Sequence, residues 1–164
     1  MARWLGVDAG AARVGLALSD PAGKLAMPLA TLDRRGLDQA EVVRRLVAVV
    51  REHEVGTVVV GLPLHLNGAK GAAAAAAEAL ADELSRALNG EPGAPQVKLQ
   101  DERGSTVQAH GLLRQAGRST KRHRPVVDQV AAVVILQAAL DNVSVTEQVG
   151  LQGWNGADQV SEET

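Results

Sequence analysis

The sequence contains no cysteine, phenylalanine or tyrosine, and only two of its 164 residues are tryptophan. Without cysteine the chain has no disulfide bond, no thiolate metal site and no cysteine nucleophile. Proteins that bind single-stranded nucleic acids by base stacking need aromatic side chains, and this chain has too few for that mode. We expect a core of valine, leucine and alanine, in which each fully buried Val or Leu contributes about 1.5–3 kcal/mol.

Long apolar segments are absent as well. No apolar run approaches the roughly 20 residues that span a bilayer, and the first residues, MARWLGVD, lack the apolar region of a secretory signal peptide. We therefore expect a cytoplasmic protein with no membrane partner. A chain of 164 residues suits one domain that folds without a structural metal or disulfide.

Basic residues are absent from the last part of the chain. Residues 142–164 hold four of the 19 acidic residues, which leaves 15 acidic residues against all 17 lysines and arginines in the preceding part. The net charge of −2 thus combines a mildly basic body with an acidic end. We expect a domain over residues 1–141 and a flexible acidic tail over 142–164.

Apolar patterning predicts an α/β fold. Short apolar runs predict strands at 3–7, 14–18, 24–32, 55–62 and 96–100. Helical periodicity, alanine content and capping residues predict helices at 38–52, 72–88, 105–116 and 125–140. The first three strands can form an antiparallel meander, and each later strand follows a helix and can join in parallel by a right-handed crossover. The sequence therefore predicts a five-stranded mixed sheet flanked by helices.

Three local patterns sharpen this prediction. Asp38 is the predicted N-cap of the first helix, and Val43, Leu46, Val47 and Val50 share one face of that helix. The continuous run VGTVVVGL at 55–62 is typical of a strand buried on both faces. The last helix is expected to turn one side to the core through Val127, Val130, Val134 and Ala138.

Acidic residues follow two predicted strands and begin a predicted helix. Asp8 ends the first strand, Asp101 and Glu102 follow the fifth, and Asp128 lies in the first turn of the last helix. Ligands of open α/β sheets bind at the carboxyl ends of strands, and carboxylates suit Mg²⁺ or Mn²⁺. Taken singly, each acid also fits a turn, a helix N-terminus or a solvated surface. As a set, they favour a metal site with the chemistry of phosphodiester hydrolysis.

Basic residues gather near these acids. The one-signed run RQAGRSTKRHRP at 114–125 fits either a phosphate contact or a solvated loop. The loop GLPLHLNGAKG precedes a helix, where backbone amides can bind phosphate, whereas His65 and His110 fit packing or surface roles. The residues predicted to contact nucleic acid are Arg13, Asn67, Lys70, Arg103, Arg118, Lys121, Arg122 and Arg124.

Four stretches in order, GVDAGAARVGLALSD, VVVGLPLHLNGAKG, DERGST and DQVAAVVILQAAL, resemble the YqgF/RuvX-like family of bacterial RNase H-like nucleases. The resemblance implies an RNase H-like fold and a nuclease that uses Mg²⁺ or Mn²⁺, expected as two ions. It implies Asp8, Glu102 and Asp128 as catalytic metal ligands, and it is the reason to choose Glu102 over Asp101. Members are described as nucleases for the 5′ end of pre-16S rRNA, and formerly as Holliday junction resolvases. The chain departs from the family pattern at Ala12, Leu66 and Gly104.

Several functions remain open at this point. The leading hypothesis is an endonuclease acting on structured RNA, such as pre-16S rRNA. A resolvase acting on branched DNA would normally be a two-fold dimer, so both a monomer and a homodimer are considered. A non-catalytic nucleic-acid-binding module is a third hypothesis. An actin-like ATPase or sugar kinase is disfavoured because such enzymes enclose nucleotide between two domains.

Overall fold

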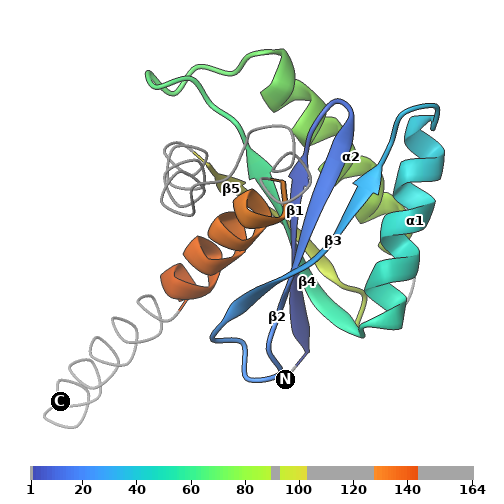
Figure 1. Ribbon diagram of the computed structural model, residues 1–164, viewed down its shortest axis with the longest axis vertical. Helices are drawn as coiled ribbons and strands as arrows, with labels where there is room; N and C mark the ends of the chain where they lie inside the picture. The colour runs from blue at the N-terminus through green and yellow to red at the C-terminus, as the bar shows by residue number, and fades with distance from the viewer. Residues whose placement is uncertain (1, 90–92, 103–127, 144–164) are drawn as a thin grey trace, which may run out of the picture.

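The computed structural model describes residues 2–89, 93–102 and 128–143 (Figure 1). Its strands are β1 (Arg3–Ala9), β2 (Arg13–Ser19), β3 (Ala26–Asp33), β4 (Val55–Leu62) and β5 (Gln96–Asp101). Its helices are α1 (Gln39–Glu52), α2 (Ala72–Leu88) and a helix over residues 128–143, which is drawn in orange. The predicted helix at 105–116, the basic run at 114–125 and all but the first two residues of the predicted tail lie outside the described residues.

The five strands form one mixed sheet in the order β3-β2-β1-β4-β5. β2 pairs antiparallel with both β1 and β3, and β4 pairs parallel with both β1 and β5. The predicted meander and the predicted parallel crossovers are therefore confirmed. This order places β1 and β4 side by side in the middle of the sheet, so the carboxyl ends of β1, β4 and β5 share one edge.

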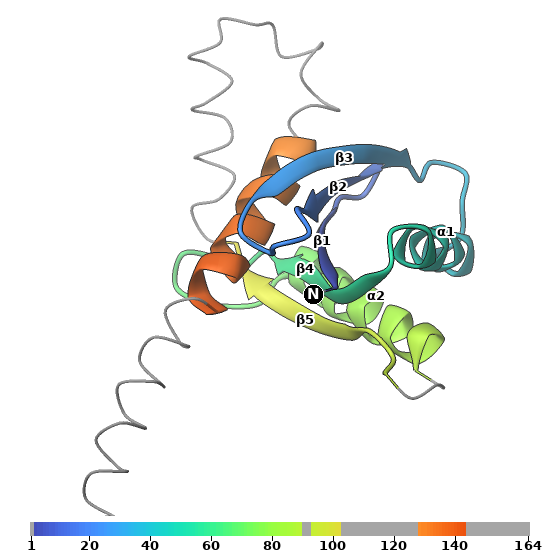
Figure 2. The same ribbon diagram turned by 90° about the horizontal axis from the view of Figure 1, so that it is seen from below.

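Helices cover both faces of the sheet, as Figure 2 shows. On one face, α1 and α2 pack over Val58 and Val60 of β4. On the other face, the helix over residues 128–143 packs over Val59. Successive residues of a strand point to opposite faces, so the predicted burial of the strand at 55–62 on both faces is confirmed. No helix in the described ranges is long and apolar enough to cross a membrane.

The start of α1 follows its sequence signals. The Asp38 carboxylate accepts a hydrogen bond from the Glu41 backbone N–H at 2.8 Å, as an N-cap residue does. The buried side of α1 consists of Val42, Val43, Leu46 and Val50. The predicted cap is thus confirmed. Three of the four residues predicted on the apolar face, Val43, Leu46 and Val50, are buried, whereas Val47 is only partly buried.

The face of the helix over residues 128–143 was predicted wrongly. Val130, Val134 and Ala138 are only partly buried, and Val127 lies outside the described residues. The buried residues are Ala131, Ala132, Ile135, Leu136, Ala139 and Leu140. Residues 130–140 are apolar except for one glutamine, so periodicity alone does not distinguish one face from its neighbour. Packing against β1 decides which face is buried, because Leu136 and Ala132 lie directly over Gly6. A Cβ added to Gly6 would lie 2.8 Å from Leu136 Cβ and 2.9 Å from the Ala132 carbonyl oxygen.

Candidate active site

Asp8 lies near the end of β1, directly opposite Gly15 of β2. Burial of its carboxyl group and repulsion by the Asp128 carboxylate raise its pKa from 3.8 to about 6. The turn that follows Asp8 is closed by a hydrogen bond of 2.9 Å from the Gly10 N–H to the Arg13 carbonyl. The Arg34 guanidinium donates to the Gly10 carbonyl at 3.2 Å, so the end of β3 also holds this turn.

Glu102 is the acid that turns inward at the end of β5. Its backbone N–H donates to the Leu62 carbonyl at 3.1 Å, which extends the pairing of β4 and β5 by one residue. Burial and the Asp8 carboxylate, followed by Asp101, raise its pKa from 4.5 to about 7. Asp101 is exposed. The Glu102 carboxylate is therefore the partly buried one that feels the Asp8 charge, and its role in the site stays a prediction.

Asp128 is brought to the same edge by the helix over residues 128–143. Arg13 Nε donates to Asp128 Oδ2 at 2.7 Å, across 115 positions of sequence. The Gln129 side chain donates to Thr31 Oγ1 at 2.9 Å, which holds this part of the helix against β3. Gly15, the residue paired with Asp8, lies against the Asp128 backbone, and the Asp128 charge contributes to the raised pKa of Asp8.

Two glycines make room for this arrangement. A Cβ added to Gly15 would collide with the Asp128 backbone carbonyl, and a Cβ added to Gly61 would collide with Glu102 Oε2. The sequence prediction missed both residues. The signal was present, because a glycine inside a strand often marks the close approach of another backbone or group.

The three predicted acids thus form two neighbouring pairs, Asp8 with Asp128 and Asp8 with Glu102, and the carboxylates of each pair repel each other. Among the residues that the structure describes, no group of three His, Asp or Glu side chains is close enough to hold a metal ion. The donor chemistry nevertheless fits a hard cation, because carboxylates are preferred ligands of Mg²⁺ and Mn²⁺. Burial, and then repulsion between the carboxylates, raises the pKa values of Asp8 and Glu102, and a cation among these acids would relieve the repulsion.

The predicted nucleic-acid contacts are only partly visible. Asn67 and Lys70 lie in the loop that follows β4, and β4 ends beside Glu102. The Asn67 side chain accepts a hydrogen bond of 2.9 Å from the Ala69 N–H, and Lys70 Nζ lies 2.7 Å from Glu78 Oε1. Arg13 Nε donates a hydrogen bond to Asp128 Oδ2 at 2.7 Å, and its predicted contact with phosphate stays a prediction. The remaining predicted contacts lie outside the described residues: Arg103, Arg118, Lys121, Arg122 and Arg124.

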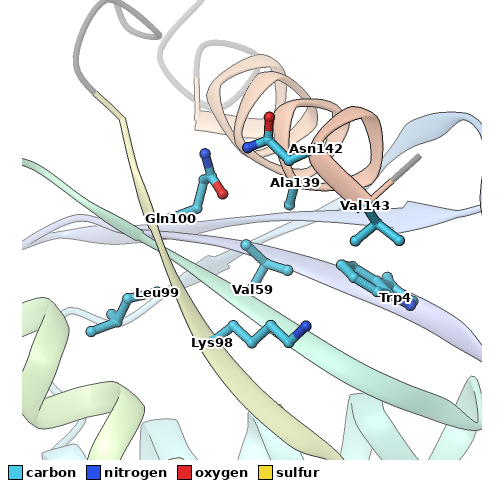
Figure 3. Close-up of a pocket in the computed structure, with 8 residues that line it drawn as sticks. All are labelled: Trp4, Val59, Lys98, Leu99, Gln100, Ala139, Asn142 and Val143. Carbon is cyan, nitrogen blue, oxygen red and sulfur yellow. The ribbon is translucent and has the colours of Figure 1, made fainter. Parts of the chain in front are cut away.

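A cavity of about 150 Å³ lies elsewhere on the sheet, between β5 and the helix over residues 128–143 (Figure 3). No acid lines it, and Trp4, which does, is at the opposite end of β1 from Asp8. The Lys98 ammonium lies 5.2 Å from the centre of the Trp4 ring, within the range of a cation–π contact. This cavity is therefore not the site formed by the carboxylates.

The chain is similar in sequence to a known protein family and to named proteins over most of its length. The model of the RuvX family, described as Holliday junction resolvase, matches residues 2–142. A protein of Clavibacter michiganensis subsp. michiganensis is 47% identical over 137 residues, which cover 84% of this chain and 81% of that protein. A protein of Rhodococcus jostii is 43% identical over 154 residues, which cover 92% and 84%. Both carry the name "Putative pre-16S rRNA nuclease".

Two solved structures share the fold at low sequence identity. Thermus thermophilus RuvC in complex with a Holliday junction substrate aligns with a TM-score of 0.51 and 15% identity, covering 84% of this chain and 93% of that one. The yeast mitochondrial Holliday junction resolvase Ydc2 aligns with a TM-score of 0.50 and 10% identity, covering 86% and 81%. These similarities concern the fold alone, and they confirm the predicted RNase H-like architecture.

Proposed function

The chain belongs to the RuvX family, and we propose from this that it is a nuclease whose hydrolysis of phosphodiester bonds depends on Mg²⁺ or Mn²⁺. The names of its sequence relatives support the nuclease activity. The observation that supports the metal dependence is pairwise: the partly buried Asp8 carboxylate feels the charge of Asp128, and the Glu102 carboxylate feels the charge of Asp8.

These three carboxylates would hold the metal, with two ions as the expected number. When bound, divalent ions supply Lewis-acid polarisation of the phosphate and lower the pKa of water. The chain itself supplies the space for these carboxylates and their partial burial. Gly15 and Gly61 let Asp128 and Glu102 approach the sheet. Partial burial of Asp8 and Glu102 limits competing water, and both must lose their protons to bind a cation.

Pre-16S rRNA is the proposed substrate, with cleavage in the maturation of its 5′ end. This proposal follows the names of the relatives from Clavibacter and Rhodococcus. A ribosomal precursor substrate would place the activity in the cytoplasm. The second candidate is branched DNA, which the description of the family model favours. A resolvase cuts two strands symmetrically and would normally require a two-fold dimer.

Cleavage assays with metal-ligand variants test the proposed chemistry. The purified full chain is incubated with an end-labelled pre-16S rRNA fragment in Mg²⁺, in Mn²⁺ or in EDTA. We expect cleavage only with the metals, and none from Asp8→Asn, Glu102→Gln or Asp128→Asn. Asp33→Asn is the matched control, because Asp33 is an exposed acid of β3 that pairs with Arg35, and it should cleave normally. Undiminished cleavage by Asp8→Asn would refute the site.

The same preparation separates the two substrates. A four-way DNA junction is offered beside the RNA fragment at equal concentration, and the mass of the active species is measured by light scattering. Preferential cutting of the RNA supports the rRNA proposal. Symmetric cutting of the junction by a dimer supports the resolvase. Salt-sensitive binding without cleavage in either metal would instead support a non-catalytic module.

A further inference from the structure

Arg13 is directed to an acid of the site by an ion pair that is partly shielded from solvent. Its Nε lies 2.7 Å from Asp128 Oδ2, and the two side chains are 27% and 19% exposed. The other ion pairs that join arginines to acids in the described ranges are more exposed on the arginine side. Arg35, Arg44 and Arg86, for example, are 72%, 66% and 77% exposed.

The packing of the helix over residues 128–143 on β2 and β3 brings Asp128 to Arg13. Arg13 and Gly15 are two positions apart on β2 and therefore project on the same face. The missing side chain at Gly15 allows the Asp128 backbone to rest on the strand, and Gln129 ties the helix start to Thr31. The Asp128 carboxylate is thus presented to Arg13 by the packing of a helix on a sheet.

A competing acid lies near Arg13 and is already paired. Asp33 is the residue opposite Arg13 in the pairing of β2 and β3. Arg35 binds Asp33 with both ends of its guanidinium, at 3.0 Å from Nε to Oδ1 and 2.8 Å from Nη2 to Oδ2. A bidentate pair of this kind satisfies both carboxylate oxygens, which leaves Asp128 as the hydrogen-bonded partner of Arg13.

We infer that Arg13 is the internal counter-ion of Asp128 in the metal-free site, and that a divalent cation must compete with it for this carboxylate. The inference rests on the proposed function. It changes the role of Arg13 from a phosphate contact to a positioning residue that acts through Asp128. A guanidinium beside a proposed metal ligand repels an incoming cation and occupies one of its ligand oxygens. Metal affinity is therefore held below the value that the three carboxylates alone would give.

Calorimetric titration with Mn²⁺, without nucleic acid, tests the inference directly. Arg13→Gln should bind Mn²⁺ about tenfold more tightly than the wild-type protein, because a nearby positive charge is removed. Arg13→Lys keeps the charge and should stay within about threefold of the wild type. Arg86→Gln is the matched control, since it removes the same charge from an exposed pair in the last turn of α2. It should leave the affinity unchanged.

A double variant tests whether the effect of Arg13 on Mn²⁺ binding depends on Asp128, and an RNA-binding assay tests whether Arg13 contacts phosphate. Once Asp128→Asn has removed the carboxylate, adding Arg13→Gln should no longer strengthen Mn²⁺ binding. In EDTA, Arg13→Gln should keep the salt dependence of RNA binding, whereas loss of one phosphate contact would lower the slope by about 0.7–0.9. Thermal unfolding of each variant confirms that the titrated protein is folded.

Unchanged or weaker Mn²⁺ binding by folded Arg13→Gln would overturn the inference. If wild-type binding is nevertheless lost in Asp8→Asn, the proposed metal site survives that failure. If neither the wild type nor Arg13→Gln binds Mn²⁺, both the metal site and the inference fail. Tighter binding by Arg13→Gln that depends on Asp128 supports both.

Discussion

Asp8 should destabilise the metal-free protein at neutral pH, and Asp8→Asn should therefore stabilise it. The pKa of the Asp8 carboxyl is about 6 in the folded protein, against 3.8 for the group in its ordinary environment. The folded protein thus binds this proton more tightly than the unfolded chain. The free energy of unfolding must fall as the pH rises from about 4 to about 6, and it stays low above that range.

The size of the effect follows from the pKa shift. A rise from 3.8 to about 6 corresponds to about 3 kcal/mol at 1.36 kcal/mol per unit. Asparagine resembles the protonated carboxyl in shape and carries no charge. Asp8→Asn should thus recover about 2–3 kcal/mol at pH 8, or roughly 5–10 °C in melting temperature for a chain of this size. Below about pH 4 the gain should disappear, because Asp8 is protonated in both states.

Urea unfolding in EDTA at pH 4 and pH 8 measures this difference. Asp33→Asn is the control of opposite sign, because Arg35 lowers the pKa of Asp33 to about 2 and its charge is favourable at pH 8. Added Mn²⁺ should raise the stability of the wild type at pH 8 but not that of Asp8→Asn. Equal unfolding midpoints of the wild type and Asp8→Asn at pH 8 would refute the electrostatic description of the site.

Two further predictions concern packing. Gly15→Ala should reduce cleavage and destabilise the fold by about 1–3 kcal/mol. The new Cβ would collide with the Asp128 backbone carbonyl and would lie 2.9 Å from Asp128 Cβ. Wild-type cleavage by this variant would show that Asp128 can shift without affecting the site. Leu80→Ala should lower the free energy of unfolding in urea by about 2–5 kcal/mol, because Leu80 is fully buried. The control is Leu66→Ala, at a side chain that is 91% exposed, which should change this free energy by less than about 0.5 kcal/mol.

Local signals account for most of the fold. The strand over Val55–Leu62 and the helix over Ala72–Leu88 have the bounds that their apolar and alanine-rich runs predict. The cap at Asp38 follows from hydrogen bonding within one turn of helix. These features depend on neighbours within a few residues, so a single sequence contains the information needed to predict them.

Features that depend on distant segments were harder to predict. The sequence pointed to acids at strand ends, but alternation along β5 could not decide between Asp101 and Glu102 without the pairing to Leu62. The apolar run at 130–140 offered several faces, and the contact of Leu136 and Ala132 with Gly6 selected one. The predicted contacts beyond residue 102 and the division at residue 141 stay predictions.

The sequence by itself determined the elements, their order and the chemical character of the site, because these follow from residue type and short-range periodicity. Tertiary structure decided which charges meet. Asp8 acquires its raised pKa from burial and from Asp128, and Arg13 finds its partner 115 residues away. Burial and Coulomb repulsion act through space, so they arise only after the helix that carries Asp128 has packed on the sheet beside Gly15.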